Sequence, residues 1–198
     1  MKTVRPSIVC MASLTIALSL FSAISVSCAP NKATLPFAVY TDAASFDTAF
    51  IPSGYMGTTS AIKMDPACTT DPHSGKDCLK VEYTATTGWG GVVWQSPAND
   101  WGSQPGGWNI SGATKLVFWA RGSKGGEKVS FLVGIIGPDK TYHDTATVKS
   151  DEVLTTSWKQ YTISLAGKDL SCIKTGFGWT LAGSSSPTTF YLDDIKYE

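Results

Sequence analysis

Short runs in which apolar and polar residues alternate follow one another from residue 37 to the end of the chain, separated by turns rich in glycine and proline. Alternation with this spacing is typical of an all-β sandwich. In the run 115–121, Leu116, Phe118 and Ala120 share one face, which we assign to the core. Only residues 43–50, after Asp42 as a capping residue, are predicted to be helical. About ten antiparallel strands are predicted, at 37–41, 61–65, 79–84, 91–95, 114–121, 128–135, 144–149, 158–165, 176–181 and 188–197.

The N-terminal segment has the pattern of an export signal. Lys2 and Arg5 precede an apolar stretch at 8–24, and small residues at 25–27 stand before Cys28. This stretch is too short and wrongly flanked for a stable membrane span. We expect residues 1–27 to be a signal peptide, and the pattern around Cys28 resembles that of bacterial lipoproteins. A lipid on Cys28 would anchor the chain to a membrane surface, with ordinary secretion as the alternative.

The remaining chain is long enough for one domain with a single core. We expect a polar tether at 28–36 and a folded domain at 37–198. Sixteen basic and sixteen acidic residues leave no net charge, whereas nucleic-acid binding requires a basic excess. Contact with a membrane is therefore expected only through a lipid anchor.

Two cysteines flank a loop in which the chain can double back. Cys68 and Cys78 enclose Pro72 and Gly75, and an exported chain meets an oxidising environment. We predict a Cys68–Cys78 disulfide, which would stabilise the fold by about 2–3 kcal/mol.

The chain contains seven tryptophans, all between Trp89 and Trp179. One small core seldom needs so many, so some are expected to face solvent and stack on the apolar faces of sugar rings. We predict that Trp89, Trp94 and Trp179 stack on a ligand, and that Gln95 and Arg121 hydrogen-bond its rim. The alternatives are that all the rings are internal, and that Arg121 only pairs with a neighbouring strand.

No arrangement of catalytic groups stands out. A glycosidase needs two carboxylates about 5–10 Å apart across the scissile bond, and no spaced carboxylate cluster is present. His73 and His143 are the only histidines, and neither accompanies a Gly-x-Ser-x-Gly elbow. We therefore expect no enzyme; a glycoside hydrolase or polysaccharide lyase with a dispersed site is the third alternative.

Four segments together resemble a known family. The stretches 51–57, 89–94, 112–122 and 190–195 are similar to the galactose-binding-like β-jelly-roll carbohydrate-binding modules of bacterial secreted proteins. This resemblance covers nearly all of residues 37–198. It implies an all-β jelly roll that binds polysaccharide or oligosaccharide without cleaving it, outside the cell or at its surface, with a separate carbohydrate-active enzyme as a possible partner. A structural or protein-binding sandwich of the same fold is the runner-up.

The resemblance also implies a structural calcium ion. Its usual ligand is the first aspartate of the last strand, which Asp193 matches here. Ca²⁺ takes six to eight oxygen ligands, so a second carboxylate is expected from the N-terminal region. Asp42 is the expected partner, with Asp47 as the nearest alternative.

Overall fold

Alternating burial along the strands divides the chain into two layers. In the computed structural model, which describes residues 31–198, the strand β6 (Lys115–Gly122) buries Leu116, Phe118 and Ala120 in the core as predicted. The expected signal peptide and the lipidated Cys28 lie outside the described residues. Within the described part of the chain, no helix is long and apolar enough to cross a membrane.

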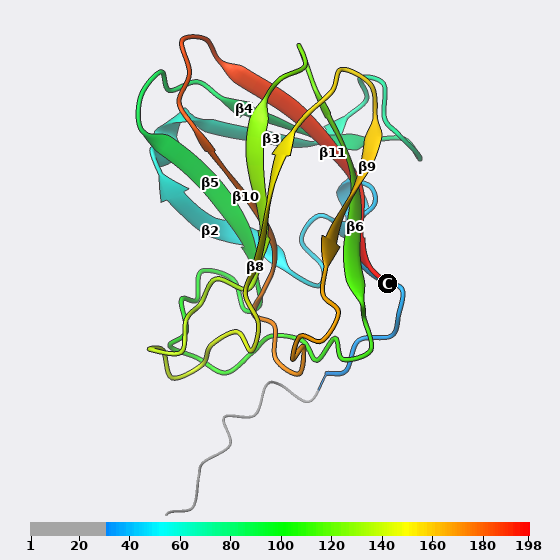
Figure 1. Cartoon of the computed structure of the whole chain (residues 1–198), viewed down its shortest axis with the longest axis vertical. Helices are drawn as coiled ribbons and strands as arrows, with labels where there is room; N and C mark the ends of the chain where they lie inside the picture. The colour runs from blue at the N-terminus through cyan, green and yellow to red at the C-terminus, as the bar shows by residue number, and fades with distance from the viewer. Residues whose placement is uncertain (1–30) are drawn as a thin grey trace, which may run out of the picture.

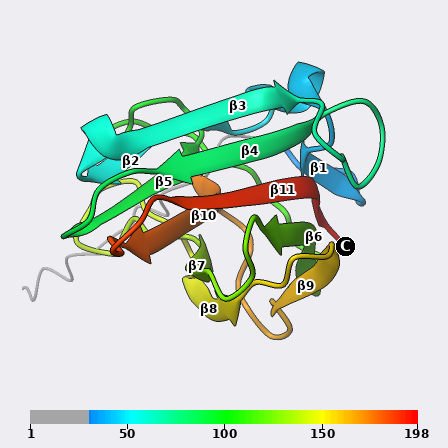
Figure 2. The same cartoon turned by 90° about the horizontal axis from the view of Figure 1, so that it is seen from above.

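Two antiparallel sheets face each other across this core (Figures 1 and 2). One has the order β3–β4–β11–β6–β9, with β1 also paired to β11; the other has the order β2–β5–β10–β7–β8. The first sheet contains β1 (Phe37–Tyr40), β3 (Ile62–Cys68), β4 (Cys78–Tyr83), β6, β9 (Lys159–Ser164) and β11 (Thr188–Tyr197). The second contains β2 (Ile51–Gly57), β5 (Trp89–Gln95), β7 (Lys128–Val133), β8 (Val148–Val153) and β10 (Thr175–Ala182).

Aromatic side chains from both sheets fill the space between the layers. The Trp94 ring lies edge-on to Phe177 at 5.5 Å, and the Trp179 ring lies edge-on to Phe190 at 5.4 Å. All four are fully buried. Such pairs add to the free energy gained by removing their large apolar area from water. The two tryptophans therefore act as central packing elements of the sandwich.

The described strands exceed the prediction by one, because β2 was not expected. Its sequence contains Pro52, Gly54 and Gly57, which hide the alternation, but β2 is an edge strand, where proline is tolerated. Gly54 is required there, since a Cβ would stand 2.4 Å from Val93 Cγ2.

Two other predicted elements differ from the structure. The helix expected at 43–50 is a single 3-10 turn, η1 (Ala43–Ser45), and a second such turn, η2 (Thr59–Ala61), precedes β3. The strand expected at 144–149 lies at Val148–Val153, because Asp144 is drawn into a buried hydrogen-bond network instead of a sheet.

Residues 31–36, the described part of the expected tether, pack against the domain. Lys32 forms a β-bridge with Asn109, and the backbone N–H of Ala33 donates to the Asn109 carbonyl at 2.8 Å. Ala33 is buried, and Leu35 packs against the core. Residues 31–36 therefore form part of the folded body.

The predicted Cys68–Cys78 disulfide is corrected by the structure. The two residues are direct partners across β3 and β4, as the loop closure required, but both are buried free thiols. The Cys78 thiol donates to the Cys68 carbonyl at 3.4 Å. Burial, with Cys68 beside it, raises the pKa of Cys78 to about 12, so this thiol stays protonated. Cys172, by contrast, is not a free thiol.

We expect Trp94→Ala and Trp179→Ala to lower the free energy of unfolding by about 3–5 kcal/mol each, because each leaves a large cavity in the core. Urea unfolding followed by circular dichroism measures this. Trp89→Ala, which removes a half-exposed ring, serves as the control and should change stability by less than about 1 kcal/mol. Equal losses in all three variants would contradict the described packing.

Candidate functional site

The outer face of the β2–β5–β10–β7–β8 sheet carries a row of side chains that runs across the strands. Residues paired directly in antiparallel strands share a face of the sheet. The pairings Met56–Gly91, Gly91–Thr180, Thr180–Ser130 and Ser130–Asp151 therefore place these five residues in one line. Trp89 lies two residues before Gly91 on β5, on the same face, opposite Ala182.

A cavity of about 780 Å³ lies over the ends of β5, β10, β7 and β8. Its walls include the β6–β7 turn at residues 124–127 and the β10–β11 turn at residues 183–187. The indole of Trp89, 48% exposed, stands at one side, and Thr180, Ser130 and Asp151 contribute polar groups from the sheet. A volume of this size accommodates a small-molecule or oligomeric ligand.

Two glycines lie close to Trp89 in the structure. A Cβ on Gly91 would stand 2.5 Å from the Trp179 carbonyl oxygen and 2.7 Å from Thr180 Cγ2, so the Thr180 side chain packs directly against this glycine. Gly57 has a φ of +70°, and a Cβ there would lie 3.1 Å from the Trp89 ring. The end of β2 therefore lies directly beside the indole.

A carboxylate lies at the far end of the row. The Ser130 hydroxyl donates to Asp151, and Lys149 Nζ lies 2.9 Å from Asp151 Oδ1. The hydrogen bonds from Ser130 and Lys149 hold the pKa of Asp151 below its usual range. The site thus combines a flat apolar ring with an ionised acceptor and two hydroxyls.

Three of the five sequence-predicted ligand contacts are buried on or beneath this sheet. Trp94 and Trp179 are fully buried in the core and present no ring face to a ligand, which corrects the expectation that they stack. Gln95 faces outward but is covered: its amide donates to the Asp100 carbonyl at 2.9 Å and accepts from Ser53 at 2.9 Å. Its role is to attach the following loop.

Arg121 lies on the other sheet, away from Trp89. Its guanidinium stands 3.9 Å above the Tyr191 ring, and Nη2 donates to the Thr70 carbonyl at 3.0 Å. Asp71 lies 3.7 Å from its Nε. This is the structural alternative considered above, with Arg121 holding the loop at residues 69–77, and it corrects the prediction that Arg121 contacts the ligand.

Of the predicted contacts, Trp89 alone lines the cavity. Sequence reasoning missed Thr180, Ser130 and Asp151. Alternation within their strands could have shown that they face outward, but only strand register brings them into line with one another.

The expected calcium ligands also point to the loop at residues 69–77. Asp193 Oδ2 accepts the backbone N–H groups of His73 at 3.0 Å and Ser74 at 3.3 Å. Asp42 Oδ1 accepts those of Lys76 at 3.1 Å and Asp77 at 3.4 Å. The loop thus offers N–H donors, where a calcium site would need carbonyl oxygens beside the carboxylates.

This donor set does not fit calcium, and we derive no step through a metal. Among residues 31–198, no group of three or more histidine, cysteine, aspartate or glutamate side chains could hold a metal ion. Burial raises the pKa of Asp193 to about 6, while the N–H donors act in the opposite direction. Asp194 adopts a positive φ at an irregularity in β11, which turns its carboxylate to His73 Nδ1 at 2.9 Å as well.

We expect the thermal midpoint of unfolding to be the same in EDTA and in millimolar calcium, because backbone N–H groups already satisfy both carboxylates. Differential scanning calorimetry measures this, with magnesium as the control for ionic strength. A midpoint that rises with calcium concentration would show that a site forms after all.

A scan against models of protein families finds no match, and a search of curated proteins finds none. Solved structures with a similar fold are found. The family 30 carbohydrate-binding module of a cellulosomal cellulase of Clostridium thermocellum has a TM-score of 0.60 at 16% identity, covering 83% of this chain and 98% of that one. The family 11 module of another cellulosomal cellulase of the same organism has a TM-score of 0.54 at 16% identity, covering 84% and 95%.

A third similar structure belongs to a larger protein. The glycoside hydrolase domain structure of Endo-D from Streptococcus pneumoniae has a TM-score of 0.51 at 17% identity, covering 73% of this chain but 21% of that one. Likeness at such identities concerns the fold. With the two facing antiparallel sheets described above, it shows that the chain has the β-sandwich jelly-roll fold of these carbohydrate-binding modules.

Proposed function

We propose that the protein binds a polysaccharide or oligosaccharide in the cavity beside Trp89 and does not cleave it. The observation that carries this proposal is the position of Trp89, a half-exposed ring at the side of a large cavity to which Thr180, Ser130 and Asp151 contribute polar groups. A sugar ring has an apolar face and a rim of hydroxyls, so it needs both kinds of surface at once. The jelly-roll fold agrees with this proposal without establishing it.

The geometry suggests how the ligand is held. The Trp89 indole stacks on the apolar face of a sugar ring. Asp151 accepts hydrogen bonds from sugar hydroxyls, and Thr180 both donates and accepts. Because Ser130 and Lys149 already orient the Asp151 carboxylate, little side-chain freedom is lost on binding.

Asp151 does not have the raised pKa of a general acid. A glycosidase needs a general acid whose pKa is raised so that it carries a proton at neutral pH. Asp151 is the carboxylate of the row, and its neighbours lower its pKa instead. A binding role uses such an ionised acceptor directly.

The expected export signal would direct the protein out of the cell, so the glycan would be bound there. A lipid on Cys28 would keep the domain at a membrane surface, where it would hold glycan or bring it to a separate carbohydrate-active enzyme. Without the lipid, the same domain would be secreted.

We expect the purified protein to be retarded in native gels that contain its polysaccharide, with β-glucan, xylan, mannan and pectin as the test set. Trp89→Ala should weaken binding at least about tenfold, because a central aromatic contact is lost, and Trp89→Phe should retain part of it. Tyr55→Ala is the matched control, since Tyr55 is 44% exposed and lies outside the cavity. Retardation in none of the gels, or unchanged retardation of Trp89→Ala, would contradict the proposed site; release of reducing ends would show an enzyme.

We also expect Asp151→Asn to weaken binding, because a charged hydrogen-bond acceptor is replaced by a weaker, neutral one. Isothermal titration calorimetry measures the change. Asp139→Asn removes an exposed acid that pairs with Lys140 and lies outside the cavity, so it controls for overall charge. Equal affinities in both variants would remove Asp151 from the site.

A further inference from the structure

We propose that Trp101 is a second stacking position, so that the protein binds an extended glycan chain reaching from the cavity to the loop at residues 96–107. This inference rests on the proposed function and extends it to the class of ligand, a long chain rather than a short oligosaccharide. Trp101 is 41% exposed and does not line the cavity beside Trp89.

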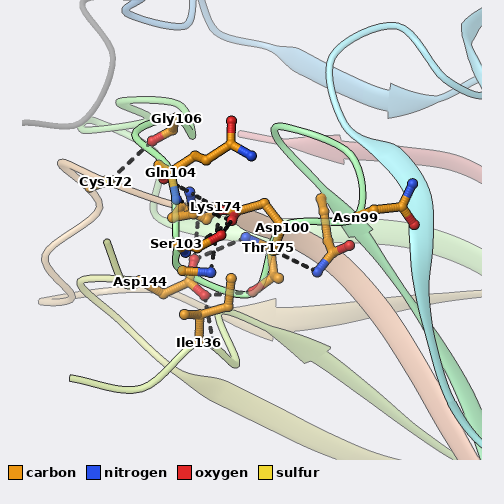
Figure 3. Close-up of polar contacts among 12 residues, drawn as sticks. Asn99, Asp100, Ser103, Gln104, Gly106, Ile136, Asp144, Cys172, Lys174 and Thr175 are labelled. Carbon is orange, nitrogen blue, oxygen red and sulfur yellow. Dashed lines mark hydrogen bonds and ion pairs between the residues drawn. The ribbon is translucent and has the colours of Figure 1, made fainter. Parts of the chain in front are cut away.

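A buried ion pair anchors the loop immediately before Trp101. Lys174 Nζ lies 2.7 Å from Asp100 Oδ2, with both side chains 1% exposed, and also donates to the Gln104 carbonyl at 2.7 Å (Figure 3). Burying two charges has a large desolvation cost that is offset only when the geometry and the remaining hydrogen bonds are good. This anchor therefore fixes the loop backbone firmly to the start of β10.

Asp100 also organises the turn that carries Trp101. Its Oδ1 accepts the backbone N–H of Ser103 at 2.9 Å, the Ser103 hydroxyl at 2.6 Å and the N–H of Gln104 at 3.1 Å. Burial would raise the pKa of Asp100, but the hydrogen bonds from Lys174 and Ser103 outweigh it and hold the pKa well below its usual range. The carboxylate stays ionised, and the turn keeps one conformation.

The loop at residues 134–147 holds the loop that carries Trp101. The carboxylate of Asp144 accepts the backbone N–H groups of Thr175 at 2.9 Å and Ile136 at 2.8 Å, which fixes the loop at residues 134–147. The N–H of Tyr142 in that loop donates to the Gly102 carbonyl at 3.1 Å. Trp101 is thus an exposed ring on a rigid backbone, and a rigid aromatic loses little entropy when it binds a ligand.

Two carboxamide side chains stand on the same loop as Trp101. Asn99 and Gln104 are exposed, and within the described part of the chain neither side-chain amide has a hydrogen bond. Figure 3 shows both amide groups pointing away from the buried network. An exposed ring on the same loop as free amide donors and acceptors suits the face and the rim hydroxyls of a sugar. The centre of a protein interface would instead need several adjacent apolar side chains, and the exposed large ones here are few and separate.

Trp89 and the loop that carries Trp101 lie at opposite ends of β5. Trp89 opens β5 and Gln95 closes it, a separation of six residues, or about 20 Å at roughly 3.3 Å per residue. The Gln95 side chain donates to Asp100, so the residue before Trp101 lies over the far end of that outer face. A ligand that contacts both rings must therefore span several sugar units.

The test compares ligand lengths, using the polysaccharide that retards the protein in gels, its trisaccharide and a long oligosaccharide of the same linkage. We expect Trp101→Ala to bind the polymer and the long oligosaccharide about tenfold more weakly and the trisaccharide with unchanged affinity. Trp89→Ala should weaken binding of all three, and Tyr55→Ala of none. Calorimetric titration gives the affinities, and an unchanged thermal midpoint of Trp101→Ala would verify that the loop still folds.

Three outcomes separate this inference from the proposed function. If Trp101→Ala binds every ligand like the wild type while Trp89→Ala does not, the second position is refuted and the proposed function stands. If Trp101→Ala loses the trisaccharide as well, the two rings do not act at separate positions, and the extended-chain inference fails. If the wild-type protein binds no glycan of any length, the proposed function itself fails.

Discussion

The register between β5 and β10 determines which side chains of the second sheet point into the core and which point to solvent. Because side chains alternate with a period of two, this register points Trp94 and Trp179 into the core and leaves Trp89 and Thr180 outside. A shift of one residue would exchange the two sets, exposing the core rings and burying the polar row. The same hydrogen-bond ladder therefore sets the packing of the sandwich and the composition of the candidate site.

Much of the fold could be predicted from the sequence, because most of the predicted strands alternate and each of the ten overlaps a strand of the structure. The choice of exposed rings could not, since apart from Gln95 both faces of Trp89–Gln95 are apolar or glycine and period two hardly distinguishes them. The odd separation of Trp89 and Trp94 does place them on opposite faces of a regular strand, and this could have excluded one of them. The partners Ser130 and Asp151 depend on register between strands far apart in sequence, which single-strand patterns do not contain.

The loop at residues 69–77 brings the two expected calcium ligands together and surrounds them with hydrogen-bond donors. Asp42 and Asp193 do converge on this loop, as the calcium expectation required, but the loop meets them with backbone N–H groups. Partial positive charge from several amides then balances the carboxylates. Arg121 completes the attachment by holding the Thr70 carbonyl, so a residue that had been assigned to a ligand serves the fold.

Gly91 affects both the pairing of β5 with β10 and the side chains of the candidate site. A side chain there would meet the Trp179 carbonyl and the Thr180 side chain, so it would press β5 and β10 apart and displace a polar side chain of the candidate site. The position of Thr180 is therefore fixed by the same close approach of two strands that holds the sheet together. Asp151 and the turns at residues 124–127 and 183–187, by contrast, can change the ligand surface without disturbing this pairing.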